Sequence, residues 1–120
     1  MDIQAISRVQ LPYPPDLQRE VAHFYGDLLG LKRMPPPGDS ALCFAARGQR
    51  VDLVATHAAP ATPPGFTPLS FEVEGLPVLR RRLLEAQVQI EEHLPLAGYV
   101  RFFVHDPAGN RLEFLEPDVY

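Results

Sequence analysis

Residues 106–117 read DPAGNRLEFLEP and predict a tight turn followed by a strand. The proline fixes one backbone φ angle and the glycine tolerates a positive one, which is typical of a turn. In residues 110–115, the apolar Leu112 and Phe114 alternate with charged side chains, as in a strand with one buried face. Residues 99–105 (YVRFFVH) alternate in the same way before the turn. The end of the chain is therefore predicted to form a β-hairpin.

The rest of the second half supplies two more predicted strands and one predicted helix. A strand is expected over residues 66–73, a helix over 76–86 and a strand over 88–92. Pro77 falls in the first turn of that helix, where proline is tolerated because the amide there has no partner within the helix. The predicted order of the second half is thus strand, helix and three strands.

The first half repeats this order. Apolar periodicity predicts an amphipathic helix over residues 17–29, with Asp16 as its N-cap and Gly30 just after its last turn. The sequence RGQ at 47–49 predicts the turn of a hairpin. The strands expected in this half cover residues 5–11, 31–34, 41–46 and 50–56.

The repeated order predicts an α+β fold of two tandem β-α-β-β-β modules. Module one covers about residues 5–57, a Pro/Ala-rich linker 58–65, and module two about 66–117. Half of this chain is close to the lower size limit of a stable fold, so we expect both modules to share one core. Residues 1–120 are accordingly predicted to be a single domain with its helices outside a curled mixed sheet.

Composition excludes several classes of protein. The 120 residues carry 15 acidic and 11 basic side chains, a net charge of −4, which disfavours binding to nucleic acid or an anionic membrane. No apolar run approaches the roughly 18 residues of a membrane span, and the first residues lack a signal-peptide pattern, so a cytoplasmic protein is expected. The single cysteine, Cys43, excludes an internal disulfide and cysteine-clustered zinc sites.

Strand parity predicts which side chains face away from the helices. If the apolar side chains of each strand pack under the helices, the alternating ones share the opposite face. That face combines apolar walls with a few charges, as small-molecule pockets do, although a solvated outer face is the alternative. The side chains placed there are Arg8, Gln10, Arg50, Asp52, Val54, Phe66, Pro68, Ser70, Tyr99, Arg101, Phe103, His105, Arg111, Glu113 and Leu115.

Two segments carry a family resemblance. HFYGDLLGL at 23–31 and DPAGNRLEFLEP at 106–117, in this order and at this separation, resemble the vicinal oxygen chelate superfamily. That superfamily includes glyoxalase I, bleomycin-resistance proteins and extradiol dioxygenases, and the resemblance spans about residues 5–117. It implies two β-α-β-β-β modules whose sheets curl into a cup, and a homodimer.

The resemblance also implies where a metal would be held. Metal-bearing members place one ligand on the first and one on the last strand of each module, positions that fall on Arg8, Asp52, Pro68 and Glu113. Only Glu113 matches the histidines and glutamates of the family, and Asp52 is a shortened carboxylate. The guanidinium of Arg8 stays protonated and Pro68 has no donor atom, so we expect no metal cofactor. A hard cation held by the two carboxylates and water is the alternative.

Arg8 could replace the metal by bridging Asp52 and Glu113 with forked hydrogen bonds. Arg101 would then be a free cation in the pocket that could hold a carboxylate or phosphate of a ligand. The alternatives are an ion pair with one of those carboxylates or a solvated charge at the rim. None of the four histidines is expected to be a metal ligand, and all are interpreted as surface or packing residues: His23, His57, His93 and His105.

Three functions stay open at this point. The first is a metal-free protein that binds a small organic molecule, anionic or aromatic. The second is a metal-dependent lyase or dioxygenase of the glyoxalase type, and the third is a fold whose pocket is filled by its own side chains. The predicted binding residues are Arg8, Gln10, Asp52, Phe66, Tyr99, Arg101, Phe103 and Glu113.

Overall fold

The computed structural model describes residues 1–36, 41–57 and 65–118. The chain divides into two compact units, Met1–Pro60 and Ala61–Tyr120. Each unit has one strand, one helical segment and three further strands, which confirms the predicted tandem β-α-β-β-β order of an α+β fold. Because each unit is compact by itself, the single core that we expect both modules to share stays a prediction.

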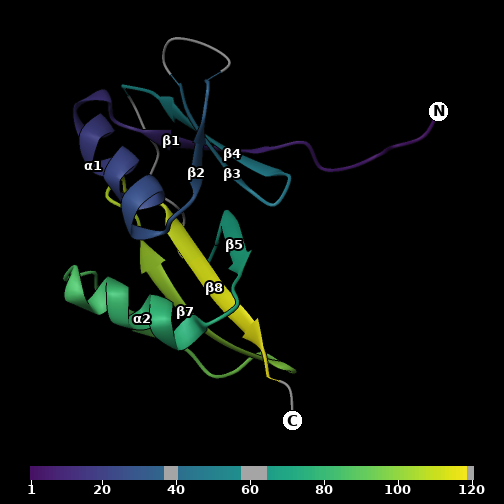
Figure 1. Ribbon diagram of the computed structural model, residues 1–120, viewed down its shortest axis with the longest axis vertical. Helices are drawn as coiled ribbons and strands as arrows, with labels where there is room; N and C mark the ends of the chain where they lie inside the picture. The colour runs from purple at the N-terminus through teal and green to yellow at the C-terminus, as the bar shows by residue number, and fades with distance from the viewer. Residues whose placement is uncertain (37–40, 58–64, 119–120) are drawn as a thin grey trace. The chain divides into compact units, whose positions relative to one another are not determined.

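The first unit holds a four-stranded mixed sheet in the order β1-β4-β3-β2. Figure 1 labels its four strands. β1 runs parallel to β4, and the two other pairs are antiparallel. The hairpin predicted at residues 47–49 is present, but its turn is one residue shorter, because Gln49 already pairs with Ala46. Arg47 and Gly48 both have positive φ, at 46° and 83°, as a two-residue hairpin turn requires. The strands are β1 (Val9–Tyr13), β2 (Lys32–Met34), β3 (Ala41–Ala46) and β4 (Gln49–Ala55).

β1 begins four residues later than the predicted strand and continues through Pro12. Its ladder starts where Val9 pairs with Val51, close to the beginning of β4, so the residues before it have no partner in this ladder. Pro12 lacks a donor but is tolerated because β1 lies at the edge of this four-stranded sheet.

The predicted helix of residues 17–29 is three consecutive pieces. A 3₁₀ turn, η1 (Pro15–Leu17), precedes α1 (Gln18–Ala22), and a π-helix, η2 (His23–Leu28), follows. The prediction of Asp16 as N-cap is wrong: Pro15 starts the 3₁₀ turn early, which places Asp16 inside the first turn rather than before it. Gly30 follows the helix with φ +74°, as predicted.

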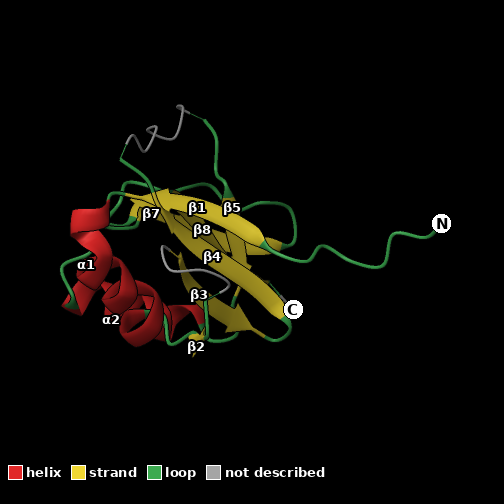
Figure 2. Cartoon of the chain, turned by 90° about the horizontal axis from the view of Figure 1, so that it is seen from above, coloured by secondary structure: helices red, strands yellow, loops and turns green. Residues whose placement is uncertain are grey.

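The core of the first unit lies between η2 and the sheet (Figure 2 shows the helical turns in red beside the strands). The ring of Tyr25 stacks on Phe44 with centroids 5.8 Å apart. A Cβ at Gly26 would lie only 3.4 Å from the Phe44 ring, so a glycine there lets the helix lie close to β3. The buried apolar residues are Leu11, Tyr13, Val21, Phe24, Tyr25, Leu42, Phe44, Val51 and Leu53.

The second unit holds a four-stranded sheet in the order β5-β8-β7-β6, with α2 (Leu76–Glu85) against β8 (Figure 1). Its strands are β5 (Leu69–Glu72), β6 (Glu91–Glu92), β7 (Tyr99–His105) and β8 (Arg111–Pro117). Phe114 lies 5.3 Å from Phe71 and 5.6 Å from Phe102, between ring centroids, in the core beneath α2.

Two strands of this unit are shorter than predicted. β6 has only two residues, because the amide of Val88 donates to the carbonyl of Leu83 and so ties residue 88 to the end of α2. β5 begins at Leu69, leaving Phe66 outside the ladder and 66% exposed. The predicted hairpin of β7 and β8 is present, with Asp106 and Asn110 buried at its turn.

Candidate functional site

The helix-free face of the first unit contains a buried carboxylate, Asp52 on β4, which is 1% exposed. Arg50, two residues earlier on the same strand, donates from Nε to Oδ1 at 3.1 Å and from Nη2 to Oδ2 at 2.9 Å. Arg8 adds a third bond, from Nη1 to Oδ2 at 3.2 Å. Both carboxylate oxygens are therefore held by guanidinium groups.

Cys43 on β3 is the register partner of Asp52 and is also buried. The hydrogen bonds from Arg50 lower the pKa of Asp52 below its ordinary value, against the opposing effect of burial. Burial raises the pKa of the Cys43 thiol, and its hydrogen bond to Asp52 adds to that rise. This cluster is thus an ionised carboxylate beside a protonated thiol.

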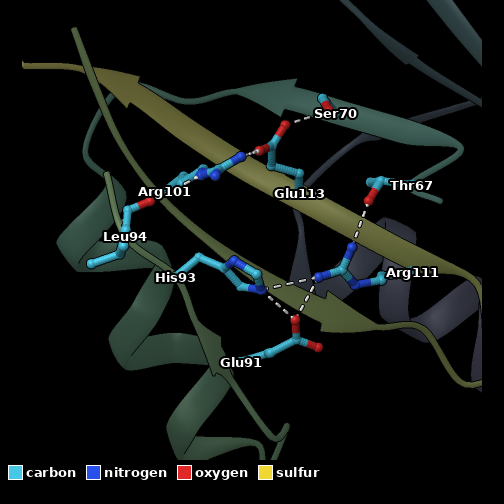
Figure 3. A network of polar contacts seen from close by, with 8 residues as sticks. All are labelled: Thr67, Ser70, Glu91, His93, Leu94, Arg101, Arg111 and Glu113. Atoms are coloured by element: carbon cyan, nitrogen blue, oxygen red, sulfur yellow. Dashed lines mark hydrogen bonds and ion pairs between the residues drawn. The ribbon is translucent and has the colours of Figure 1, made fainter. Parts of the chain in front are cut away.

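The helix-free face of the second unit carries Glu113 on β8. Its Oε1 accepts a hydrogen bond from Ser70 at 2.6 Å and its Oε2 one from Arg101 Nη1 at 3.0 Å (Figure 3). Arg101 also donates from Nε to the carbonyl of Leu94 at 3.2 Å. Of the three alternatives for Arg101, the structure shows the ion pair.

Arg111, also on β8, is fixed on several sides. Its Nη1 donates to Thr67 at 2.9 Å and its Nη2 to Glu91 Oε2 at 2.5 Å, as Figure 3 shows. Glu91 Oε2 also lies 2.7 Å from His93 Nε2. The hydrogen bonds from Arg111 and then from His93 lower the pKa of Glu91. The guanidinium of Arg111 lies 3.9 Å above the ring centroid of Phe103.

A hollow of ≈ 580 Å³ opens between these groups. Phe103 on β7 is among its lining residues but is only 4% exposed, with Arg111 and the ring of His93 packed against it. Most of its lining side chains are charged or polar. Its lining residues are Gly65, Thr67, Glu91, His93, Arg101, Phe103, Arg111 and Glu113.

The structure brings the predicted binding residues together in two groups. Arg8 and Asp52 are in contact in the first unit, and Arg101, Phe103 and Glu113 line the hollow of the second. Gln10 and Phe66 are exposed and Tyr99 is half-buried, and neither Phe66 nor Tyr99 is part of the hollow's lining.

Sequence reasoning gave no binding role to five residues of the hollow: Gly65, Thr67, Glu91, His93 and Arg111. Strand parity had placed Arg111 on this face without assigning it a partner. His93 had been interpreted as a surface or packing residue, and its contact with the Phe103 ring at 4.6 Å does pack it. Only the pairing of β6 with β7, which sets Glu91 opposite Phe103, shows that this short strand borders the hollow.

The resemblance would place metal ligands at Arg8, Asp52, Pro68 and Glu113. The residues at these four positions do not fit a divalent metal. Arg8 is a cation, and Pro68 has no side-chain donor. The two carboxylates already accept hydrogen bonds at both oxygens, Asp52 from Arg8 and Arg50, and Glu113 from Ser70 and Arg101. Within residues 1–36, 41–57 and 65–118, no three His, Cys, Asp or Glu side chains form a group that could hold a metal ion.

No family model and no curated protein matches the sequence, but solved structures do. A protein from Bacillus anthracis, provisionally assigned to the glyoxalase family, matches over 98% of each chain with a TM-score of 0.87 and 24% identity. TnmS3, an antibiotic binding protein from Streptomyces sp. CB03234, matches with a TM-score of 0.80 and 20% identity, over 98% of this chain and 99% of its own. The chain has the vicinal oxygen chelate fold.

Different activities occur among proteins that share the vicinal oxygen chelate fold with this chain. Lactoylglutathione lyase from Agrobacterium tumefaciens matches over 97% of this chain and 96% of its own, with a TM-score of 0.75 and 21% identity. A lyase and an antibiotic binding protein are thus both among the similar structures, so the fold does not choose between them.

In the described part of the chain, no helix is long and apolar enough to cross a bilayer.

Proposed function

We propose that this protein binds a small organic molecule without a metal, in the hollow of its second unit. The observation that carries the proposal is the donor chemistry at the family ligand positions. Arg8 and Pro68 stand where lone-pair donors are needed, and Asp52 and Glu113 are both held by arginine. A metal-dependent lyase or dioxygenase would need a cation with open coordination positions, which this donor set does not support.

The hollow supports binding in its own right. Its volume of ≈ 580 Å³ falls within the roughly 300–1,000 Å³ of small-molecule sites. Arg101 and Arg111 place hydrogen-bond donors at its wall, and each is held by a carboxylate, so their geometry is set before a ligand arrives. The similarity to TnmS3, an antibiotic binding protein, fits this function.

Elemental analysis tests the absence of a metal. The purified protein is incubated with nickel, zinc or iron, freed of unbound metal and analysed, with an untreated sample beside it. We expect well under one metal per chain in every sample. One tightly held divalent metal per chain would overturn the proposal and favour the lyase or dioxygenase.

A thermal-shift screen tests binding. Small aromatic and anionic compounds are added in the presence of a chelator, and the melting temperature is compared with that of the protein alone. At least one class of compound is expected to raise it, because a ligand that binds only the folded state stabilises that state. Stabilisation that disappears with chelator would contradict metal-free binding.

We further propose that the binder is one domain, works as a homodimer and is cytoplasmic. The dimer is supported by the resemblance to the superfamily, and the cytoplasm by a single buried cysteine that needs no oxidising compartment. Light scattering during size-exclusion chromatography tests the dimer, for which we expect about twice the 13.4 kDa of one chain. A mass of one chain at micromolar concentration would contradict it.

A further inference from the structure

The guanidinium of Arg111 is held as a flat plate in the hollow. Its central carbon lies over the ring of Phe103, 3.9 Å from the ring centroid. Its hydrogen bonds to Thr67 and Glu91 lie along its edges, since guanidinium N–H groups point outward in the plane. Nη2 also lies 3.2 Å from His93 Nε2, and 15% of the side chain is exposed. A ligand that stacks on this guanidinium would use the face away from Phe103.

Arg101 supplies donors beside this plate. Its Nε and Nη1 are used by Leu94 and Glu113. In the described part of the chain, nothing accepts a hydrogen bond from its Nη2, so two N–H groups of this half-buried arginine are left for a ligand or water. The hollow thus combines a flat cationic face with a nearby set of donors.

The two arginines do not give the hollow an excess of positive charge. Glu113 neutralises Arg101, and Glu91 neutralises Arg111. The affinity of an uncharged ligand should therefore be close to that of an anionic ligand of the same shape. The arginines favour a ligand that has an oxygen to accept hydrogen bonds. They also favour a flat ligand, because guanidinium planes stack well on conjugated rings.

We propose that the hollow selects a flat, conjugated ring system with an oxygen acceptor at its edge. The ring stacks on the free face of Arg111, which gives a Phe103–Arg111–ligand sandwich, and the oxygen accepts from Arg101. A carboxylate and a ketone both provide the oxygen, so flatness is the selected property and charge is secondary. This inference rests on the proposed binding function and names the ligand class for the same site.

Four probes separate flatness from charge, with affinities measured by isothermal titration calorimetry. They are 2-naphthoate, which is flat and anionic; 2-acetylnaphthalene, which is flat and neutral; decahydro-2-naphthoate, which keeps the carboxylate without the flat ring; and naphthalene, which lacks the oxygen. We expect both flat oxygen-bearing probes to bind at least tenfold more tightly than the other two. This comparison uses the unaltered protein and needs no variant to fold.

The Arg111→Lys variant then tests whether the guanidinium plane of Arg111 is needed for binding. Lysine keeps the charge beside Glu91 but offers no plane, so the preference for 2-naphthoate over its saturated counterpart should fall by at least fivefold. Arg81→Lys, an exposed arginine on α2, is the matched control and should keep the preference. Circular dichroism establishes that both variants are folded.

Several outcomes would overturn the inference. These are equal affinity for 2-naphthoate and decahydro-2-naphthoate, a preference that survives in a folded Arg111→Lys variant, or binding of none of the four probes. In each of these cases, a non-planar compound that stabilises the protein in chelator would leave the proposed binding function standing. One bound metal per chain would instead defeat the proposed function itself.

Discussion

Arg50 holds both carboxylate oxygens of Asp52 from two positions away on the same strand, with bonds of 3.1 Å and 2.9 Å. Residues two apart on a strand share a face, so this forked pair needs no bend in the backbone. It leaves Asp52 buried, ionised and fully occupied by its own neighbours. The helix-free face of the first unit is thereby stabilised by a buried ion pair between neighbouring residues of one strand.

Replacing Asp52 by asparagine should lower the free energy of unfolding by about 3 kcal/mol at pH 7, because two guanidinium groups lose their buried anion. The pKa of Asp52 is lowered in the folded state, chiefly by Arg50. The stabilisation is therefore present above the unfolded pKa and is lost as the pH falls through the folded one. Denaturant unfolding should show parent and Asp52→Asn converging between about pH 5 and pH 2.

Asp118→Asn is the control for that experiment, because Asp118 is exposed near the end of the second unit. It should change the unfolding free energy by less than about 0.5 kcal/mol at any pH. A difference between parent and Asp52→Asn that stays constant down to pH 2 would show that the carboxylate is not held ionised.

The two arginines around Asp52 should differ in their contribution to stability. Arg50 makes two bonds in a fork, whereas Arg8 makes one bond of 3.2 Å and its side chain is 43% exposed. Arg8→Met should therefore cost at most about 1 kcal/mol, as exposed ion pairs do. Arg50→Met should lower the urea midpoint further than Arg8→Met, and the reverse order would contradict the geometry.

The thiol of Cys43 should be inert while the protein is folded. It is buried, and burial together with the hydrogen bond to Asp52 raises its pKa, so little thiolate forms near neutral pH. A disulfide reagent such as DTNB at pH 8 should react with it only at the rate at which the structure opens. Reaction of the native protein as fast as that of the urea-unfolded chain would refute this.

Glu116 should stabilise α2 from outside the helix. Its carboxylate accepts from the amides of Gly75, at 2.5 Å, and Leu76, at 3.2 Å, at the positive end of the helix. Glu116→Gln should lower the unfolding free energy by about 1 kcal/mol. Glu85→Gln, at the opposite end of α2, is the matched change and should be neutral or slightly stabilising, since an anion there is unfavourable. Equal losses from both changes would contradict the capping role.

Much of the fold follows from local periodicity. The alternation in residues 99–105 and 110–115 predicted β7 and β8, and the glycine at 48 marked the hairpin of β3 and β4. Strand ends were less predictable, because they depend on where a partner strand stops. β6 illustrates this: Val88 has strand character but donates to Leu83 at the end of α2.

Residue type and spacing are enough to predict the order of the elements, the alternation of side chains along each strand and the absence of ligand atoms at Arg8 and Pro68. Which charged groups meet depends on the three-dimensional fold. Asp52 is bound by Arg50 rather than by Arg8 alone, and Arg111 is fixed by Thr67 and Glu91 over Phe103. Parity gives the face on which a side chain lies, whereas its partners depend on strand register, and register is set by the packing of the whole sheet.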